Sequence, residues 1–297
     1  MKKSAHKRRM TRHRRQKQIR RNVSLVVLSA LLLLIIILRG INENGDHSDG
    51  ISVAASPVPV TSVPISPSPT PIPDSSASVP ASSQNTIDLS DYPESLIDFM
   101  NKYPEATSFV LDYPQKKDNH PVIDLSEEIT QGQIPLFLQW DERWGYETYG
   151  DDLLGITGCG PTCLSMVYCG LTGKSNWNPF QVALMAEEAS FYVDGVGSSW
   201  DLMQSGARSL GLNVREISLN ADSIKGALIS GIPIICSVTS GDFTYSGHFI
   251  VLTGVDENGD ITLNDPNSRN NSMKSWDIYD LLPQISGLWG YTYDAEK

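Results

Sequence analysis

Residues 158–167, GCGPTCLSMV, join a glycine-rich turn to the start of a buried helix and place a cysteine at the junction. The glycines on either side of Cys159 allow the backbone to bend tightly there. Pro161 suits the first turn of a helix, where its missing N–H group is not needed. Apolar residues continue the helix, and Gly170 is expected to end it. The pattern therefore predicts a cysteine at a helix N-terminus.

This position favours a reactive thiolate at Cys159. Unpaired N–H groups and the positive end of the helix dipole stabilise negative charge on a sulfur there. The alternative interpretation is a small apolar residue packed in a core, which describes most cysteines. The other cysteines are Cys163, Cys169 and Cys236. A disulfide between Cys169 and Cys236 is left open, and the cysteine spacing matches no common zinc pattern.

Charge divides the chain into a basic head and an acidic body. The net charge is −11, yet residues 1–39 contain 12 Lys or Arg and no Asp or Glu. The remainder therefore holds 23 − 12 = 11 basic residues against 34 acidic ones, a balance of −23. An acidic body repels phosphate, so no nucleic-acid partner is expected.

An uncharged run of 16 residues, VSLVVLSALLLLIIIL, occupies positions 23–38. It is slightly shorter than the ~20 residues that span a bilayer comfortably. Arg20 and Arg21 precede it, so the positive-inside rule predicts a basic cytoplasmic tail over 1–22, a single-pass signal anchor over 23–38, and an extracytoplasmic body. A cleaved signal peptide, which would give a secreted protein, is the alternative. The Ser- and Pro-rich residues 39–85 predict a disordered stalk.

Beyond the stalk, the pattern predicts a helical prefix over 86–133 and a main domain over 134–297. Proline-bounded helices are expected at Glu94–Lys102 and Glu105–Asp112, and the sequence does not decide whether the prefix is separate or the first layer of the main domain. In the main domain helices precede an antiparallel sheet, which is an α+β order. Further helices are expected at 178–189, 199–210 and 222–230, and strands at 212–217, 233–238, 248–255, 261–264 and 288–293.

One histidine, His248, falls within the expected main domain. A cysteine nucleophile needs a proton acceptor, so His248 is the candidate base for Cys159. Acyl transfer also needs hydrogen-bond donors for the developing oxyanion. The backbone N–H of Cys159 is one candidate, and the side-chain amide of Gln139 is the second.

A hairpin between the last strands predicts the group that orients His248. A four-residue loop would pair Val255 with Asp260 and bring Asp265 diagonally next to His248, within reach of the side chains. A loop of three or five residues would instead turn Asn264 to this side. In another interpretation Asp265 belongs only to a turn.

Four segments, LFLQWD, TGCGPTCLSM, SGHFIVLTG and LNDPNS, carry these residues in the order Gln–Cys–His–Asp. The series resembles papain-like cysteine peptidases, specifically the bacteriocin-leader (double-glycine) processing peptidases and their stand-alone exported relatives. The resemblance covers about residues 134–293. It implies a papain-like fold, in which a helical layer carries the cysteine and a C-terminal antiparallel sheet carries the histidine and aspartate. By this resemblance Cys159 is the nucleophile, His248 the base, Asp265 the orienting acid and Gln139 the oxyanion donor.

The chain departs from the family pattern in two respects. The gap between Gln139 and Cys159 is wider than in papain or the transporter-fused enzymes. The resemblance does not extend to an ATP-binding cassette, so coupling to transport and double-glycine specificity are not implied. The plant papain motif would assign the nucleophile to Cys163, whereas the helix-start argument and the closer family favour Cys159.

These features together predict a membrane-anchored, extracytoplasmic cysteine peptidase. It would act on peptide or protein substrates through a Cys–His–Asp triad and an acyl-enzyme, without a cofactor or a metal ion. The alternatives are a transglutaminase-like acyltransferase with the same triad, and a catalytically silent binding module on a stalk. The oligomeric state is left open.

Overall fold

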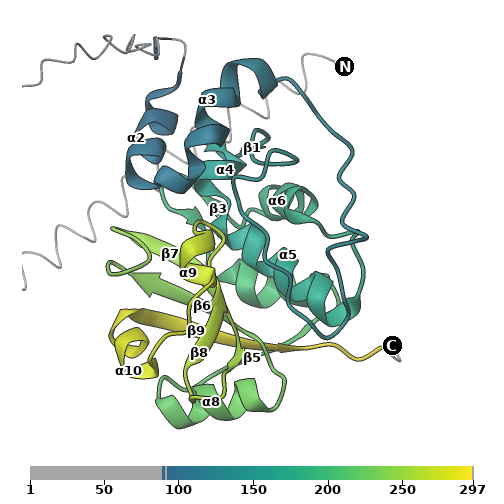
Figure 1. Cartoon of the computed structure of the whole chain (residues 1–297). Coiled ribbons are helices and arrows are strands. Elements are labelled where there is room, and N and C mark those ends of the chain that lie inside the picture. Colours follow the sequence, from purple (N-terminus) through teal and green to yellow (C-terminus); the bar gives the residue numbers. More distant parts are fainter. Residues whose placement is uncertain (1–88, 91, 296–297) are drawn as a thin grey trace, which may run out of the picture. The chain divides into compact units, whose positions relative to one another are not determined.

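The computed structural model describes residues 89–90 and 92–295 (Figure 1). These residues all fall within one unit, residues 81–297. The predicted tail, signal anchor and stalk lie outside the described residues. None of the described helices is long and apolar enough to cross a membrane.

The helical prefix consists of α2 (Glu94–Lys102), the 3-10 turn η1 (Pro104–Ala106) and α3 (Thr107–Lys116). The first helix has the predicted bounds, whereas the second starts later and ends later than expected. Buried residues of the prefix form a small core with Tyr146 of the main domain, whose ring stacks on Phe109 at 4.3 Å between centroids. The prefix is therefore packed onto the main domain as a layer.

The central helix of the main domain is α5 (Cys159–Thr172), and nearly all of its residues are buried. It ends at Gly173, whose φ of 71° is left-handed, so the predicted end at Gly170 is wrong. Gly170 serves a different purpose, because a Cβ there would lie 2.6 Å from the side chain of Ile134. The chain before α5 could not pass this close to a larger residue.

The other helices of the main domain are shorter than α5. The expected helix at 199–210 is instead a π-helical turn followed by a single α turn. The remaining helices are α4 (Leu154–Thr157), α6 (Pro179–Glu188), η2 (Leu202–Gly206), α7 (Ala207–Ser209), α8 (Ala221–Ile229), α9 (Arg269–Ser272), α10 (Ile278–Leu281) and η3 (Leu282–Gln284).

A five-stranded antiparallel sheet follows in the order β5-β9-β6-β7-β8. Its strands are β5 (Asn213–Glu216), β6 (Ile234–Thr239), β7 (Gly247–Val255), β8 (Ile261–Asn264) and β9 (Ile285–Thr292). Two small hairpins pair β1 (Thr148–Tyr149) with β2 (Asp152–Leu153) and β3 (Tyr192–Val193) with β4 (Gly197–Ser198). The predicted order of helices first and an antiparallel sheet second is confirmed, and this mixed fold fits a papain-like peptidase.

Both faces of the sheet are covered by helices (Figure 1). Alternate residues of β7 point to opposite faces, as the pleat of a strand requires. Phe249 and Val251 join the core around α5, whereas Ile250 and Leu252 join the core beneath α8 and α10. The strand that carries His248 is thus anchored from both sides.

The β7–β8 hairpin differs from the predicted one in two ways that cancel. Its loop has five residues, because Val255 pairs with Ile261 rather than with Asp260. A bulge between Leu252 and Gly254 then shifts the register by one residue, so that Val251 pairs with Asn264. Beyond the bulge the register is the predicted one.

Candidate active site

A cavity of about 390 Å³ lies where the prefix, the start of α5 and the loop before β7 meet. Cys159, His248 and Gln139 all line it, together with Tyr103 of the prefix and Val196 of the β3–β4 hairpin. The structure thus brings three of the four predicted site residues to one surface cavity.

Cys159 is the first residue of α5, so its N–H group has no partner within that helix. It is partly exposed, as access by a substrate requires. The adjacent glycines are needed for space: a Cβ at Gly158 would clash with the carbonyl oxygen of Leu154, and one at Gly160 with the side chain of Ser198. The local packing therefore explains the predicted turn into the helix.

His248 and Asp265 form a buried pair. The His248 Nε2 atom lies 2.7 Å from Oδ1 of Asp265, and the side chains are 6% and 1% exposed. This contact leaves the Nδ1 side of the ring for the cavity. Asn264, the alternative partner, donates its amide hydrogens to the carbonyl oxygens of Ile134 and Pro135.

Other hydrogen bonds hold the Asp265 carboxylate in place. Oδ1 accepts from the backbone N–H of Asn267 at 2.9 Å, and Oδ2 accepts from the side-chain amide of Asn271 at 2.8 Å. The backbone N–H of Asp265 donates to Ser272. Asp265 does sit in a turn, as the alternative interpretation held, and that turn aims it at His248.

The surroundings of His248 raise the pKa of its ring. Burial acts against the charged imidazolium, but the charge and hydrogen bond of Asp265, followed by a hydrogen bond and charge at Cys159, outweigh it. The pKa rises from 6.5 to about 10. The imidazolium is therefore favoured at neutral pH and stands next to the sulfur.

Gln139 lies at the cavity, but its side-chain amide is engaged elsewhere. Nε2 donates to the carbonyl oxygens of Gly155 at 2.9 Å and Ile156 at 3.1 Å, and Oε1 is buried without a hydrogen-bond partner. Both amide hydrogens are used in this arrangement. An oxyanion role for Gln139 would require the amide to reorient, and that role stays a prediction.

The remaining cysteines lie in the core. Cys163 is fully buried, donates to the carbonyl oxygen of Phe249 at 3.2 Å, and has a pKa raised by burial. Cys169 and Cys236 are buried free thiols on opposite faces of the sheet, so no disulfide joins them. Of the four cysteines, Cys159 alone lines the cavity. The papain-motif alternative, Cys163, has no access to substrate.

Tyr103 is a cavity residue that the sequence did not single out. Burial raises the pKa of its hydroxyl, and the negative charges of Asp265 and Cys159 raise it further. The phenol therefore stays neutral at neutral pH and can donate a hydrogen bond. Nothing in its local sequence distinguishes it from the other tyrosines, because its place depends on how the prefix docks.

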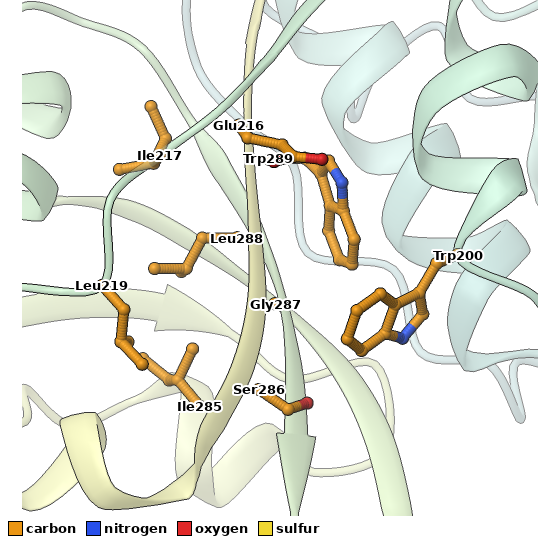
Figure 2. A pocket seen from close by; sticks show the side chains of 9 residues that line it. All are labelled: Trp200, Glu216, Ile217, Leu219, Ile285, Ser286, Gly287, Leu288 and Trp289. Atoms are coloured by element: carbon orange, nitrogen blue, oxygen red, sulfur yellow. The ribbon is translucent and has the colours of Figure 1, made fainter.

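A second hollow, of about 210 Å³, lies along β9 beyond the end of β5 (Figure 2). The rings of Trp200 and Trp289 meet there edge to face, 5.3 Å apart. Its lining contains Glu216 but neither cysteine nor histidine, so it offers no nucleophile and base. Within the part of the chain that the structure describes, no three His, Cys, Asp or Glu side chains group as metal ligands.

Comparison with known proteins places these residues within a family. The model of the Peptidase_C39 like family matches residues 131–294. A comparison with curated proteins found no match. Among solved structures, the chain is similar to the peptidase domain of ComA from Streptococcus, described as a bi-functional ABC transporter involved in a quorum sensing pathway. The identity is 19% and the TM-score 0.33, over 46% of this chain and 93% of that one.

The family match confirms the resemblance inferred from the four sequence segments. It covers the start of α5, the β7–β8 hairpin and the acid-bearing turn, and it spans more than half of the chain. The chain therefore belongs to the Peptidase_C39 like family and is a cysteine peptidase.

Proposed function

We propose that the protein hydrolyses peptide bonds outside the cytoplasm through a triad of Cys159, His248 and Asp265. The observation that supports this most is the meeting of a partly exposed sulfur and an imidazole at one cavity, with a buried carboxylate hydrogen-bonded to the imidazole from behind. A nucleophile, a base and an orienting group in this relation are what acyl transfer through a thioester requires.

In the first half-reaction the sulfur of Cys159 attacks the substrate carbonyl carbon. The C–N bond breaks, the acyl group stays on sulfur as a thioester, and the imidazolium of His248 gives its proton to the leaving amine. In the second half-reaction a water molecule attacks the thioester while the now neutral His248 accepts a proton from it. The carboxylic acid leaves and the sulfur is regenerated, while Asp265 keeps the ring oriented.

The developing oxyanion needs donors at the helix start. The N–H of Cys159, at the positive end of the α5 dipole, is well placed to be one. The amide of Gln139 could supply the second only by releasing the two carbonyl groups that it now binds.

Analysis of reaction products tests this proposal against acyl transfer and against a binding module. We expect the full-length protein, incubated with a mixture of peptides in H₂¹⁸O, to release new C-termini that carry ¹⁸O. Mass spectrometry would detect them, and protein pretreated with iodoacetamide serves as the control. Amide products that form only with added amine would indicate an acyltransferase, and intact peptides in all samples a non-catalytic module.

We also propose that residues 23–38 anchor the protein in the cell membrane with its N-terminus in the cytoplasm. The uncharged run and the arginines before it support this topology. We expect the protein to stay in the membrane fraction after carbonate washing, and a variant lacking 23–38 to leave it. Protease added to intact cells should degrade the part that contains Cys159. A soluble wild-type protein shortened at its N-terminus would instead indicate a cleaved signal peptide.

A further inference from the structure

The prefix contacts the turn that carries Asp265, although it lies outside the residues that the family model matches. Glu105, in η1, accepts a hydrogen bond from the hydroxyl of Ser268 and another from the backbone N–H of Asn270 at 3.1 Å. Ser268 is buried and Glu105 is partly buried. These two charge-assisted bonds join residues more than 160 positions apart.

The contact continues by hydrogen bonds to the candidate triad. The Ser268 oxygen that donates to Glu105 also accepts from the backbone N–H of Asn271 at 3.1 Å. The side-chain amide of Asn271 donates to Oδ2 of Asp265 at 2.8 Å. Oδ1 of the same carboxylate contacts His248. An unbroken series of polar contacts therefore links the prefix to the imidazole.

Other hydrogen bonds also support this turn: the indole N–H of Trp276 donates to the carbonyl oxygen of Asn271 at 3.1 Å, and the Ser272 hydroxyl donates to that of Ser268 at 2.8 Å. Trp140 donates its indole N–H to the carbonyl oxygen of Asn267, and the N–H of Gln139 donates to that of Pro266. Both bonds hold the beginning of the turn. From the prefix, Glu105 adds bonds to the Ser268 hydroxyl and the Asn270 N–H, where α9 begins.

We propose that Glu105 is a positioning residue for the Asp265 turn, and that the helical prefix is a permanent part of the active unit rather than a pro-segment to be removed. The inference rests on the triad of the proposed function. A displacement of about 1 Å in a catalytic group can lower a rate about 100-fold, so a restraint on this turn affects turnover more than substrate binding.

Charged and titratable groups near this contact come from several elements. Lys102 of α2 and Asp242 of the β6–β7 loop line the same hollow of about 200 Å³ as Glu105. On the cavity side, Cys159 raises the pKa of His248, and Tyr103 lies close enough to Asp265 and Cys159 for both to raise its own pKa. Variants that keep all four groups isolate the effect of Glu105.

The test compares Glu105→Gln and Glu105→Ala with Glu94→Gln in the full-length protein. Glu94 is an exposed carboxylate in the first turn of α2 that does not line the cavity, so it controls for lost charge in the prefix. For Glu105→Ala we expect kcat to fall about 10- to 100-fold with KM nearly unchanged. Glu105→Gln keeps one oxygen that can accept from either the Ser268 hydroxyl or the Asn270 N–H, so its kcat should lie between those of Glu105→Ala and the wild type. Glu94→Gln should match the wild type.

A double-mutant cycle tests whether the effect passes through Ser268. If Glu105 acts through Ser268, combining Glu105→Ala with Ser268→Ala should lower kcat little further than Ser268→Ala alone. Strictly additive losses would show that Glu105 acts by another route and would overturn the proposal.

The proton affinity of His248 gives a measure that does not depend on turnover. NMR titration of the ring, assigned by comparison with a His248→Gln sample, should show a lower pKa in Glu105→Ala, because a displaced Asp265 stabilises the imidazolium less. If Glu105→Ala leaves the His248 pKa and kcat unchanged and lowers only the Tm, Glu105 contributes to stability alone and the positioning role is excluded. A wild type without peptidase activity would contradict the proposed function, while the titration would still test the positioning role.

Discussion

Replacing Cys159 with alanine is expected to lower kcat/KM for peptide hydrolysis by at least about 10⁴-fold, because removal of the nucleophile leaves only binding and oxyanion stabilisation. The fold should persist, since Cys159 is partly exposed and opens onto a cavity. Steady-state cleavage of a peptide identified by mass spectrometry would measure the loss, and the unchanged Tm of the variant would exclude unfolding.

Cys163→Ala is the matched control, because it removes the same group from the same helix one turn further on. Cys163 is fully buried, so the change should cost about 1–2 kcal/mol of unfolding free energy through lost packing. Its kcat/KM should stay within a few-fold of the wild type. The reverse result, activity lost at Cys163 and kept at Cys159, would transfer the nucleophile to Cys163.

Replacing His248 with glutamine is expected to lower kcat/KM about 10³- to 10⁴-fold, because general acid and base catalysis are lost together. Glutamine can still hydrogen-bond to Asp265, so burial of that carboxylate is less disturbed than with an apolar substitute. Kinetics at neutral pH would measure the effect. An active variant with an unchanged rate would remove His248 from the mechanism.

The same residue determines the expected alkaline limit of wild-type activity. The imidazolium must donate a proton to the leaving amine, and its pKa is raised from 6.5 to about 10. Activity should therefore persist above pH 6.5 and decline as the pH approaches about 10. The free energy of unfolding should also decrease at alkaline pH. The proton bound by folded His248 stabilises the fold fully below pH 6.5, and this contribution is lost as the pH rises through the folded-state pKa of the ring. A pH–rate profile and thermal unfolding at several pH values would measure both.

The prefix contributes residues to the site that lie outside the part of the chain matched by the family model. The matched residues contain the cysteine, the histidine and the aspartate, but one wall of the cavity comes from α2 and Tyr103. Tyr103 enters the cavity from that wall, and Glu105 reaches the turn behind Asp265. We therefore expect substitutions in the prefix, outside the family region, to change turnover in this chain.

Local pattern in the sequence was sufficient to predict several elements. The apolar runs on either side of residues 256–259 and the proline before α2 predicted bounds for β7, β8 and α2 that agree with the structure to within a residue. The helix start at Cys159 was predictable because glycine and proline act on the backbone within a few residues. The helix end predicted at Gly170 was wrong, because the sequence does not distinguish a glycine that ends a helix from one that lets a neighbouring segment pack closely.

The meeting of His248 and Asp265 shows what local pattern could not determine. The five-residue loop alone would have turned Asn264 toward the histidine, and the bulge near Gly254 reversed that effect. Bulges arise from the fit of a whole strand between its neighbours, so a count of loop residues does not reveal them.

The sequence by itself determined the helix-then-sheet order, the cysteine at a helix start and the family, because these depend on residue type, spacing and chain order. Tertiary structure alone decided that Tyr103 enters the cavity, how the amide of Gln139 is engaged, and that Glu105 reaches the turn behind Asp265. Each of these depends on packing between segments far apart in the chain. Such packing does not produce a recognisable pattern in the sequence of either segment.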